Sequence, residues 1–166
     1  MNPKILILGH GRHGKDVVAD LIVEHFGLTK CSSSMFAAEK AVRPWLEQNR
    51  GLFYETLEAC YEDRVNHRQD WYQAICDYNR DDLSRLAADV LEVSDIYVGM
   101  RDDREFYASR HLFDHVIGVT AFERVKALDP TFLIDLGECD HIVENDNDLE
   151  DLENEVIVLM ETRILI

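Results

Sequence analysis

Residues 9–16 carry the densest chemical pattern in the chain. They read GHGRHGKD, which matches the phosphate-binding pattern G-x-x-x-x-G-K. Glycine lets successive backbone N–H groups turn toward one anion, and a lysine after the last glycine reaches the β and γ oxygens of a bound nucleotide. The pattern predicts a nucleotide-phosphate site made by Gly9, Gly11, Arg12, His13, Gly14, Lys15 and Asp16.

Asp16 departs from this pattern, in which a Ser or Thr hydroxyl usually ligates Mg²⁺. A carboxylate is also a hard oxygen donor, so Asp16 is a candidate metal ligand, either directly or through water. The alternative is that Asp16 only stabilises the positive amino-terminal end of the helix that follows.

Five arginines are candidates for a second anion site. Arg64 and Arg68 stand four residues apart and would share one face of a continuous helix, where two guanidinium forks suit a phosphate monoester. Arg101 follows a predicted strand, and ligands bind where parallel strands end. Arg43 and Arg124 are weaker candidates on the same reasoning. The alternatives are surface ion pairs: Arg64 and Arg68 with Glu62 and Asp63, and Arg101 with Asp102 or Asp103.

The elements that must position these groups alternate between strands and helices. Short apolar runs predict buried strands at 4–8, 29–34, 96–100, 114–121 and 142–143. Helical patterns cover 15–26, 35–48 with a kink at Pro44, 52–79 with a break near 65–66, 82–93, 102–110, 122–128 and 149–161. Buried strands separated by helices favour an α/β fold with a short parallel sheet between two helical layers.

The length of 166 residues suits one domain, residues 1–166. Segment 35–93 is too long for a simple crossover, so we interpret it as a helical insertion that binds the acceptor, with a short lid at about 122–139. The net charge of −16 opposes loose binding to nucleic acid backbones and anionic membranes. The four widely spaced cysteines suit free thiols in a reducing cytoplasm.

Several motifs in order resemble the bacteriophage deoxynucleoside monophosphate kinase-like P-loop proteins. They are the loop at 9–16, SSSMFAAE from Ser32, YEDR from Tyr61, YVGMR from Tyr97 and DHIVEN from Asp140. The group is related to phage kinases of hydroxymethylpyrimidines in DNA, and the ending also resembles that of dephospho-coenzyme A kinases. The resemblance spans nearly the whole chain and implies a nucleoside monophosphate kinase fold that uses ATP and Mg²⁺ in the cytoplasm, that of the host cell if the gene is a phage's.

The resemblance also implies roles for individual residues. Residues 9–16 would hold the ATP phosphates, Asn145 would lie near adenine, and Arg124 would be the lid arginine. The acceptor would be bound by Ser33, Ser34, Phe36, Arg43, Arg64, Arg68 and Arg101. Lys15, Asp16, Arg101 and Arg124 would carry the catalysis.

The expected acceptor is a deoxynucleoside monophosphate. Modified DNA is an alternative partner, a homodimer stays open, and we expect no membrane partner. The lid offers only Arg124 and Lys126, and the strand at 96–100 lacks a Walker B acid. These departures keep open a third hypothesis, a nucleotide-binding module without catalysis.

Overall fold

The computed structural model describes residues 2–166 and contains five parallel strands in the order β2-β3-β1-β4-β5. β1 is flanked on both sides because its four residues are apolar and fully buried, as a central parallel strand requires. The strands are β1 (Ile5–Leu8), β2 (Lys30–Ser32), β3 (Ile96–Val98), β4 (His115–Thr120) and β5 (His141–Glu144).

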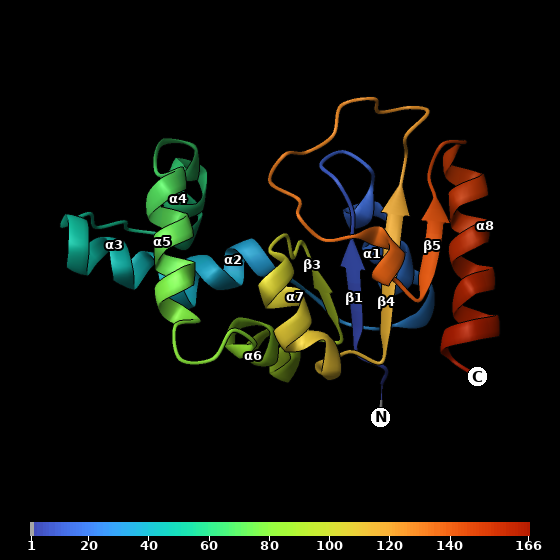
Figure 1. Ribbon diagram of the computed structural model, residues 1–166, viewed down its shortest axis with the longest axis horizontal. Coiled ribbons are helices and arrows are strands. Elements are labelled where there is room, and N and C mark those ends of the chain that lie inside the picture. The colour runs from blue at the N-terminus through green and yellow to red at the C-terminus, as the bar shows by residue number, and fades with distance from the viewer. Residues whose placement is uncertain (1) are drawn as a thin grey trace.

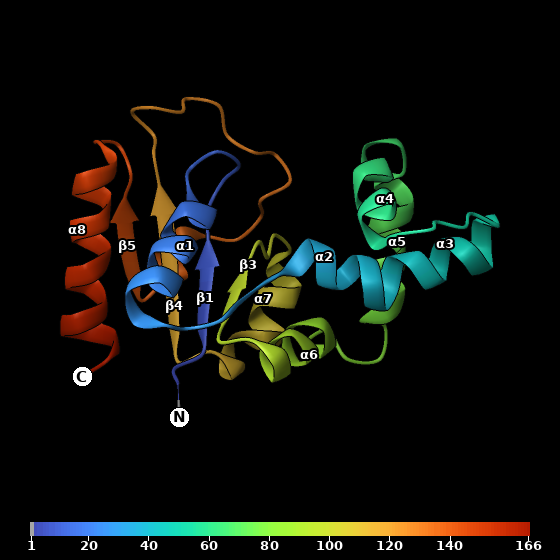
Figure 2. The same ribbon diagram turned by 180° about the vertical axis from the view of Figure 1, so that it is seen from behind.

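Two apolar cores cover the two faces of this sheet. Side chains alternate along β1, so Ile5 and Ile7 join a core with α1 (Lys15–Phe26) and α8 (Leu149–Leu159). Leu6 and Leu8 join the opposite core, with α6 (Arg85–Val93) and α7 (Asp103–Ser109). Figures 1 and 2 show these helices on the two faces, which gives the predicted three-layer α/β/α arrangement.

The segment between β2 and β3 forms a helical arm that extends beyond the sheet (Figure 1). Its own apolar core includes Leu46, Cys60 and Trp71. The arm comprises α2 (Ser33–Ala37), a π turn (Ala38–Val42), α3 (Arg43–Arg50), α4 (Leu57–Glu62), a 3-10 turn (Asp63–Asn66), α5 (Arg68–Tyr78) and α6.

Two helical predictions were wrong in detail. The expected helix over 122–128 is absent, because the N–H groups of Glu123 and Arg124 donate to the Asp146 carboxylate, and Phe122 and Leu128 bury no apolar face. The stretch 52–79 begins as a helix only at Leu57, but the break predicted near 65–66 is confirmed, because a 3-10 turn (Asp63–Asn66) and His67 separate α4 from α5. Pro44 is the second residue of α3, which directly follows the π turn.

None of the helices among residues 2–166 combines the length and apolar character needed to cross a bilayer. The loop at 9–14 and the irregular segment 121–135 lie together at the carboxyl ends of the strands (Figure 1). The helical arm adjoins this edge through α2, which follows β2 directly.

Candidate nucleotide and acceptor site

The loop between β1 and α1 has the backbone of an anion cradle. Arg12 and Gly14 take positive φ angles of 67° and 96°. Left-handed residues placed between right-handed ones turn successive backbone N–H groups toward the same side of a loop. A Cβ on Gly9 would stand 2.6 Å from the Val119 carbonyl oxygen, so the loop lies directly against β4. Gly9 is therefore required by close packing, and Gly14 by its backbone conformation.

Two side chains hold this loop from beneath. His13 is fully buried, and its Nδ1 accepts a hydrogen bond of 3.1 Å from the Ala121 N–H, so the ring proton stands on Nε2. Burial lowers the His13 pKa, which keeps the ring neutral. Asn145 donates from Nδ2 to the His13 carbonyl over 3.0 Å, and its own N–H donates to the Thr120 carbonyl.

His13 and Asn145 are thus supports of the loop. The His13 ring is buried beneath the loop in a T-shaped contact with Phe122, with ring centroids 5.0 Å apart, so a role of His13 toward nucleotide falls to its backbone. Asn145, which the family resemblance places near adenine, lies directly under Gly14 in this structure. Arg12 is exposed on the outer side of the loop.

A polar cavity of about 250 Å³ opens beside the loop. Three cations line it, Lys15, Arg64 and Arg101, together with one carboxylate, Asp16. Burial lowers the Lys15 pKa, Asp16 opposes this shift, and Arg101 adds to it. A bound anion would stabilise the charged form of Lys15 and raise its pKa again, so the cavity is electrostatically suited to phosphate. The remaining lining residues are Ser33, Ser34, Tyr61, Val98 and Gly99.

The arm positions Arg64 through its neighbour Tyr61. The guanidinium carbon stands 3.9 Å from the Tyr61 ring centroid, and Nη1 donates to the Tyr61 carbonyl over 2.9 Å. These contacts leave the rest of the planar donor fork for a ligand. Tyr61 was missed by the sequence reasoning, although its spacing of three residues from Arg64 was a usable signal.

Arg101 is paired on the other side of the polar cavity. Its Nη1 donates to the Asp129 carboxylate and to Thr131 Oγ1, so the predicted alternatives Asp102 and Asp103 are not its partners. Asp102 instead caps α7 and pairs with Arg104. Asp129 and Thr131 were missed because only the fold of the irregular segment brings them to β3.

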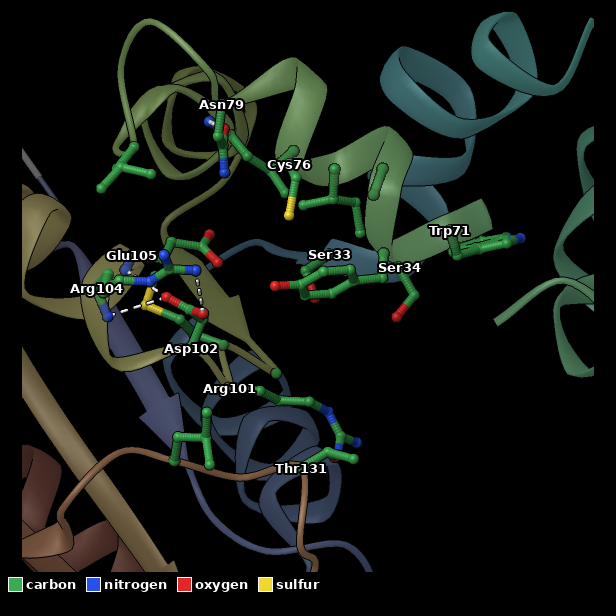
Figure 3. Close-up of a pocket in the computed structure, with 18 of the residues that line it drawn as sticks. Ser33, Ser34, Trp71, Cys76, Asn79, Arg101, Asp102, Arg104, Glu105 and Thr131 are labelled. Carbon is green, nitrogen blue, oxygen red and sulfur yellow. Dashed lines mark hydrogen bonds and ion pairs between the residues drawn. The ribbon is translucent and has the colours of Figure 1, made fainter. Parts of the chain in front are cut away.

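An apolar cavity of about 470 Å³ adjoins the polar one and shares Ser33, Ser34, Gly99 and Arg101 with it. Its walls come from α5, α6, β3 and α7, and Figure 3 shows the labelled side chains around it. Gly99, at φ 104°, lies where a Cβ would stand 3.1 Å from Ser33 Oγ. The two cavities thus meet where β3 ends, next to the start of α2.

The structure does not bring all predicted acceptor residues to these cavities. Arg43 donates to the Tyr54 carbonyl over 2.6 Å and so holds the segment after α3. Arg68 is exposed, because the break before α5 turns it away from Arg64. Phe36 is buried in the core beneath the sheet. None of the three lines either cavity.

Arg124 lies on the β5 side of the loop. Its Nε donates to the Asn145 carbonyl over 3.1 Å, and its side chain lines neither cavity. Lys126, the other cation of the lid, is exposed and pairs with Glu123. The segment 121–135 is tied instead by its backbone, since the Asp129 N–H donates to His10 Nδ1 over 3.1 Å.

Comparison with known proteins places the fold. A crystal structure of TT1252 from Thermus thermophilus matches with a TM-score of 0.55 and 17% identity over 98% of this chain and 99% of that one. An unliganded sugar kinase from Janibacter sp. HTCC2649 matches with a TM-score of 0.50 and 12% identity over 99% of this chain and 98% of that one. No protein-family model and no curated protein matches the sequence. These likenesses show the fold, an α/β arrangement with a parallel sheet flanked by helices.

Proposed function

We propose that this chain transfers the γ-phosphoryl group of ATP to a deoxynucleoside monophosphate. One observation carries the proposal: a three-cation polar cavity beside the glycine loop continues into an apolar cavity of about 470 Å³. A ligand that is anionic at one end and planar and apolar at the other matches this pair of cavities. The structural similarity to a sugar kinase supports the same reaction class.

The loop fits the phosphates of ATP. Positive φ at Arg12 and Gly14 supports an inward set of N–H groups, and Lys15 follows at the start of α1. ATP supplies the phosphoryl group when bound. For Mg²⁺, Asp16 is the one carboxylate that lines the polar cavity, and this metal commonly takes one or two carboxylates, with water and phosphate oxygens completing the shell.

The chain's own residues would act by positioning and by charge. Lys15 would neutralise the β and γ oxygens, while Arg64 and Arg101 hold the acceptor phosphate in line. An acceptor oxygen then forms its bond to the γ-phosphorus as the bond to the β–γ bridging oxygen breaks, and ADP leaves with that oxygen. A monophosphate is already anionic, so the step needs no general base. Arg124 would close over the transferring group from the lid only by leaving the Asn145 carbonyl, to which its Nε donates.

Lys15→Met tests the proposal directly. With labelled ATP and Mg²⁺, we expect wild-type protein to label a deoxynucleoside monophosphate, and we expect the variant to lose at least about 100-fold in kcat, in line with the loss of one charge-stabilising group. Lys126→Met is the matched control, because that exposed ammonium pairs only with Glu123. Wild-type turnover in Lys15→Met would refute the assignment.

The same assay separates the alternatives. Hydroxymethylated DNA, offered in parallel, would become labelled if the acceptor were a base alcohol in DNA. ATP binding without transfer to any acceptor in the panel would identify a nucleotide-binding module. The homodimer stays a prediction.

A further inference from the structure

The apolar cavity has a polar end away from the phosphate loop. Figure 3 shows Ser33, Ser34, Arg101 and Thr131 on one side of the cavity, with Asn79 and Glu105 on the other. The first group adjoins the polar cavity. Near the second group the cavity is lined by apolar side chains, among them Ile75 of α5, Leu86 of α6 and Met100 after β3, and by the charged pair of Asp102 and Arg104. A monophosphate held at Arg101 would therefore direct its base toward Asn79 and Glu105.

Glu105 has fewer hydrogen-bond donors than a carboxylate in such surroundings requires. Among residues 2–166, the Tyr97 hydroxyl alone donates to it, to Oε1 over 3.4 Å. Burial raises the Glu105 pKa to about 7, the Tyr97 contact opposes that rise, and the charge of Asp102 adds to it. A ligand that supplies N–H donors would stabilise the carboxylate.

Asn79 supplies a hydrogen-bond donor, whereas Glu105 supplies acceptors. Asn79 is 4% exposed, and its Oδ1 accepts from the Leu86 N–H over 3.0 Å, which fixes the orientation of the amide. Its Nδ2 therefore remains as a donor, and among residues 2–166 the bond from the Leu86 N–H is the one hydrogen bond of the Asn79 side chain, which lines the apolar cavity. A carbonyl oxygen on the ligand would satisfy it.

The bases differ in how well they match this set. Guanine carries two adjacent N–H donors, N1–H and the 2-amino group, next to the O6 acceptor. Thymine and uracil offer one such donor beside a carbonyl, and the edges of adenine and cytosine offer one amino group beside a ring acceptor. A carboxylate accepts two parallel donors in a bidentate manner, so guanine fits Glu105 best.

We propose that Glu105 and Asn79 select a guanine base, so that the acceptor is a guanine nucleoside monophosphate. This inference rests on the proposed function for its phosphate end. Glu105 would accept from N1–H and the 2-amino group, and Asn79 would donate to O6. The apolar side walls would cover the two ring faces.

Calorimetric titration at pH 8 with dGMP, dIMP, dAMP, dCMP and dTMP tests the selection. We expect dGMP to bind tightest, and dIMP, which lacks only the 2-amino group, to bind about 10- to 100-fold more weakly. This comparison changes the ligand and leaves the protein intact. The Glu105→Gln variant should lose about 10- to 100-fold in dGMP affinity and change little toward dTMP.

Asp103→Asn is the matched control, because Asp103 lies on the same helix and lines neither cavity. Circular dichroism establishes that both variants fold. Tighter binding of another base, or an unchanged ranking in Glu105→Gln, would overturn the inference while leaving monophosphate binding in place. If none of the five nucleotides binds, the proposed function falls as well.

Discussion

Among residues 2–166, Arg101 is the one cation that lines both cavities (Arg104 lines the apolar cavity alone), and its guanidinium is paired with Asp129 and Thr131. Asp129 accepts from it, and the Asp129 carboxylate also lies near the loop, 3.4 Å from where a Cβ on Gly11 would stand. Burial would raise the Asp129 pKa, but donation from Thr131 and from Arg101 lowers it to about 2. This carboxylate is ionised at neutral pH and, under the proposed function, would compete with the acceptor phosphate for the same cation.

Asp129→Asn should therefore strengthen acceptor binding. The variant removes the competing charge and keeps the backbone bond from the Asp129 N–H to His10. An interaction between partly exposed charges of about 1 kcal/mol predicts that the KM for a deoxynucleoside monophosphate falls about 3- to 10-fold. Initial-rate kinetics with the acceptor varied measures this. Glu123→Gln, an exposed acid of the same segment, is the control, and a KM that rises in Asp129→Asn would contradict the argument.

Residues of the site could be predicted from the sequence where a local motif or a neighbouring strand fixes their position. Lys15 lies in a motif whose geometry is fixed over eight residues, and Arg101 directly follows a buried strand, so both positions were predictable. Arg68 was misplaced because its role assumed an unbroken helix through His67, whose φ of −129° ends that periodicity. Asp129 and Glu105 reach the site only through tertiary packing, for which a single sequence holds no local signal.

At the scale of elements, the phosphate loop depends on β4 and β5, which follow it by more than 100 residues in the chain. Ala121, after β4, donates to His13 Nδ1, and Asn145, after β5, donates to the His13 carbonyl. The loop thus rests on the ends of two neighbouring strands. A change at this junction should affect stability and nucleotide binding together.

Gly14→Ala probes this junction. At φ 96°, the new Cβ would stand 2.2 Å from Asn145 Nδ2, which must move and leave the His13 carbonyl without its donor. We expect the free energy of unfolding to fall by about 2–4 kcal/mol, from left-handed strain and the lost buried bond, and ATP affinity to fall at least about 10-fold.

Gly51→Ala is the control that separates backbone strain at positive φ from the steric clash with Asn145. The φ of Gly51 is 65°, and nothing lies within 4 Å of its added Cβ, so only about 1 kcal/mol should be lost and ATP binding should persist. Denaturant unfolding and ATP titration compare the two variants. Equal losses in both would mean that the Asn145 contact does not hold the loop.

Helices and strands with strong local sequence signals were predictable. Segments in which a distant residue competes for the backbone hydrogen bonds were not. β1, α1 and α8 form where apolar runs and capping residues agree, as at Asp148, whose side chain accepts from the Asp151 N–H. The segment 122–128 has helical composition, yet Asp146 captures its N–H groups from a distant part of the chain. The arrangement of strands into one parallel sheet followed from their alternation with helices.

At the scale of the whole molecule, the two ends of the parallel strands differ, because the glycine loop follows the carboxyl end of β1 and a network of polar side chains lies at the amino-terminal ends. Opposite the phosphate loop, Asp95 precedes β3 and joins three parts of the chain. Its carboxylate accepts from the Thr29 N–H and hydroxyl, from Asn2, and from Lys4, at distances of 2.9–3.2 Å. Burial would raise the Asp95 pKa, but these donors lower it to about 2. The network thus fastens the amino-terminal ends of the central strands.

The Asp95 network should control how the free energy of unfolding changes with acid pH, and it should leave ATP affinity and acceptor KM unchanged. Because the folded pKa of Asp95 lies below the unfolded value of about 3.9, its carboxylate stabilises the fold above that value, and this contribution is lost as the pH falls toward 2. Asp95→Asn should lower the free energy of unfolding by about 2–3 kcal/mol at pH 7, with the difference from wild type vanishing near pH 2. Urea titrations across this range measure it, with ATP affinity and acceptor KM at neutral pH as the control for the opposite edge. A difference that stayed constant with pH would mean that packing, and not the charge of Asp95, holds these strands together.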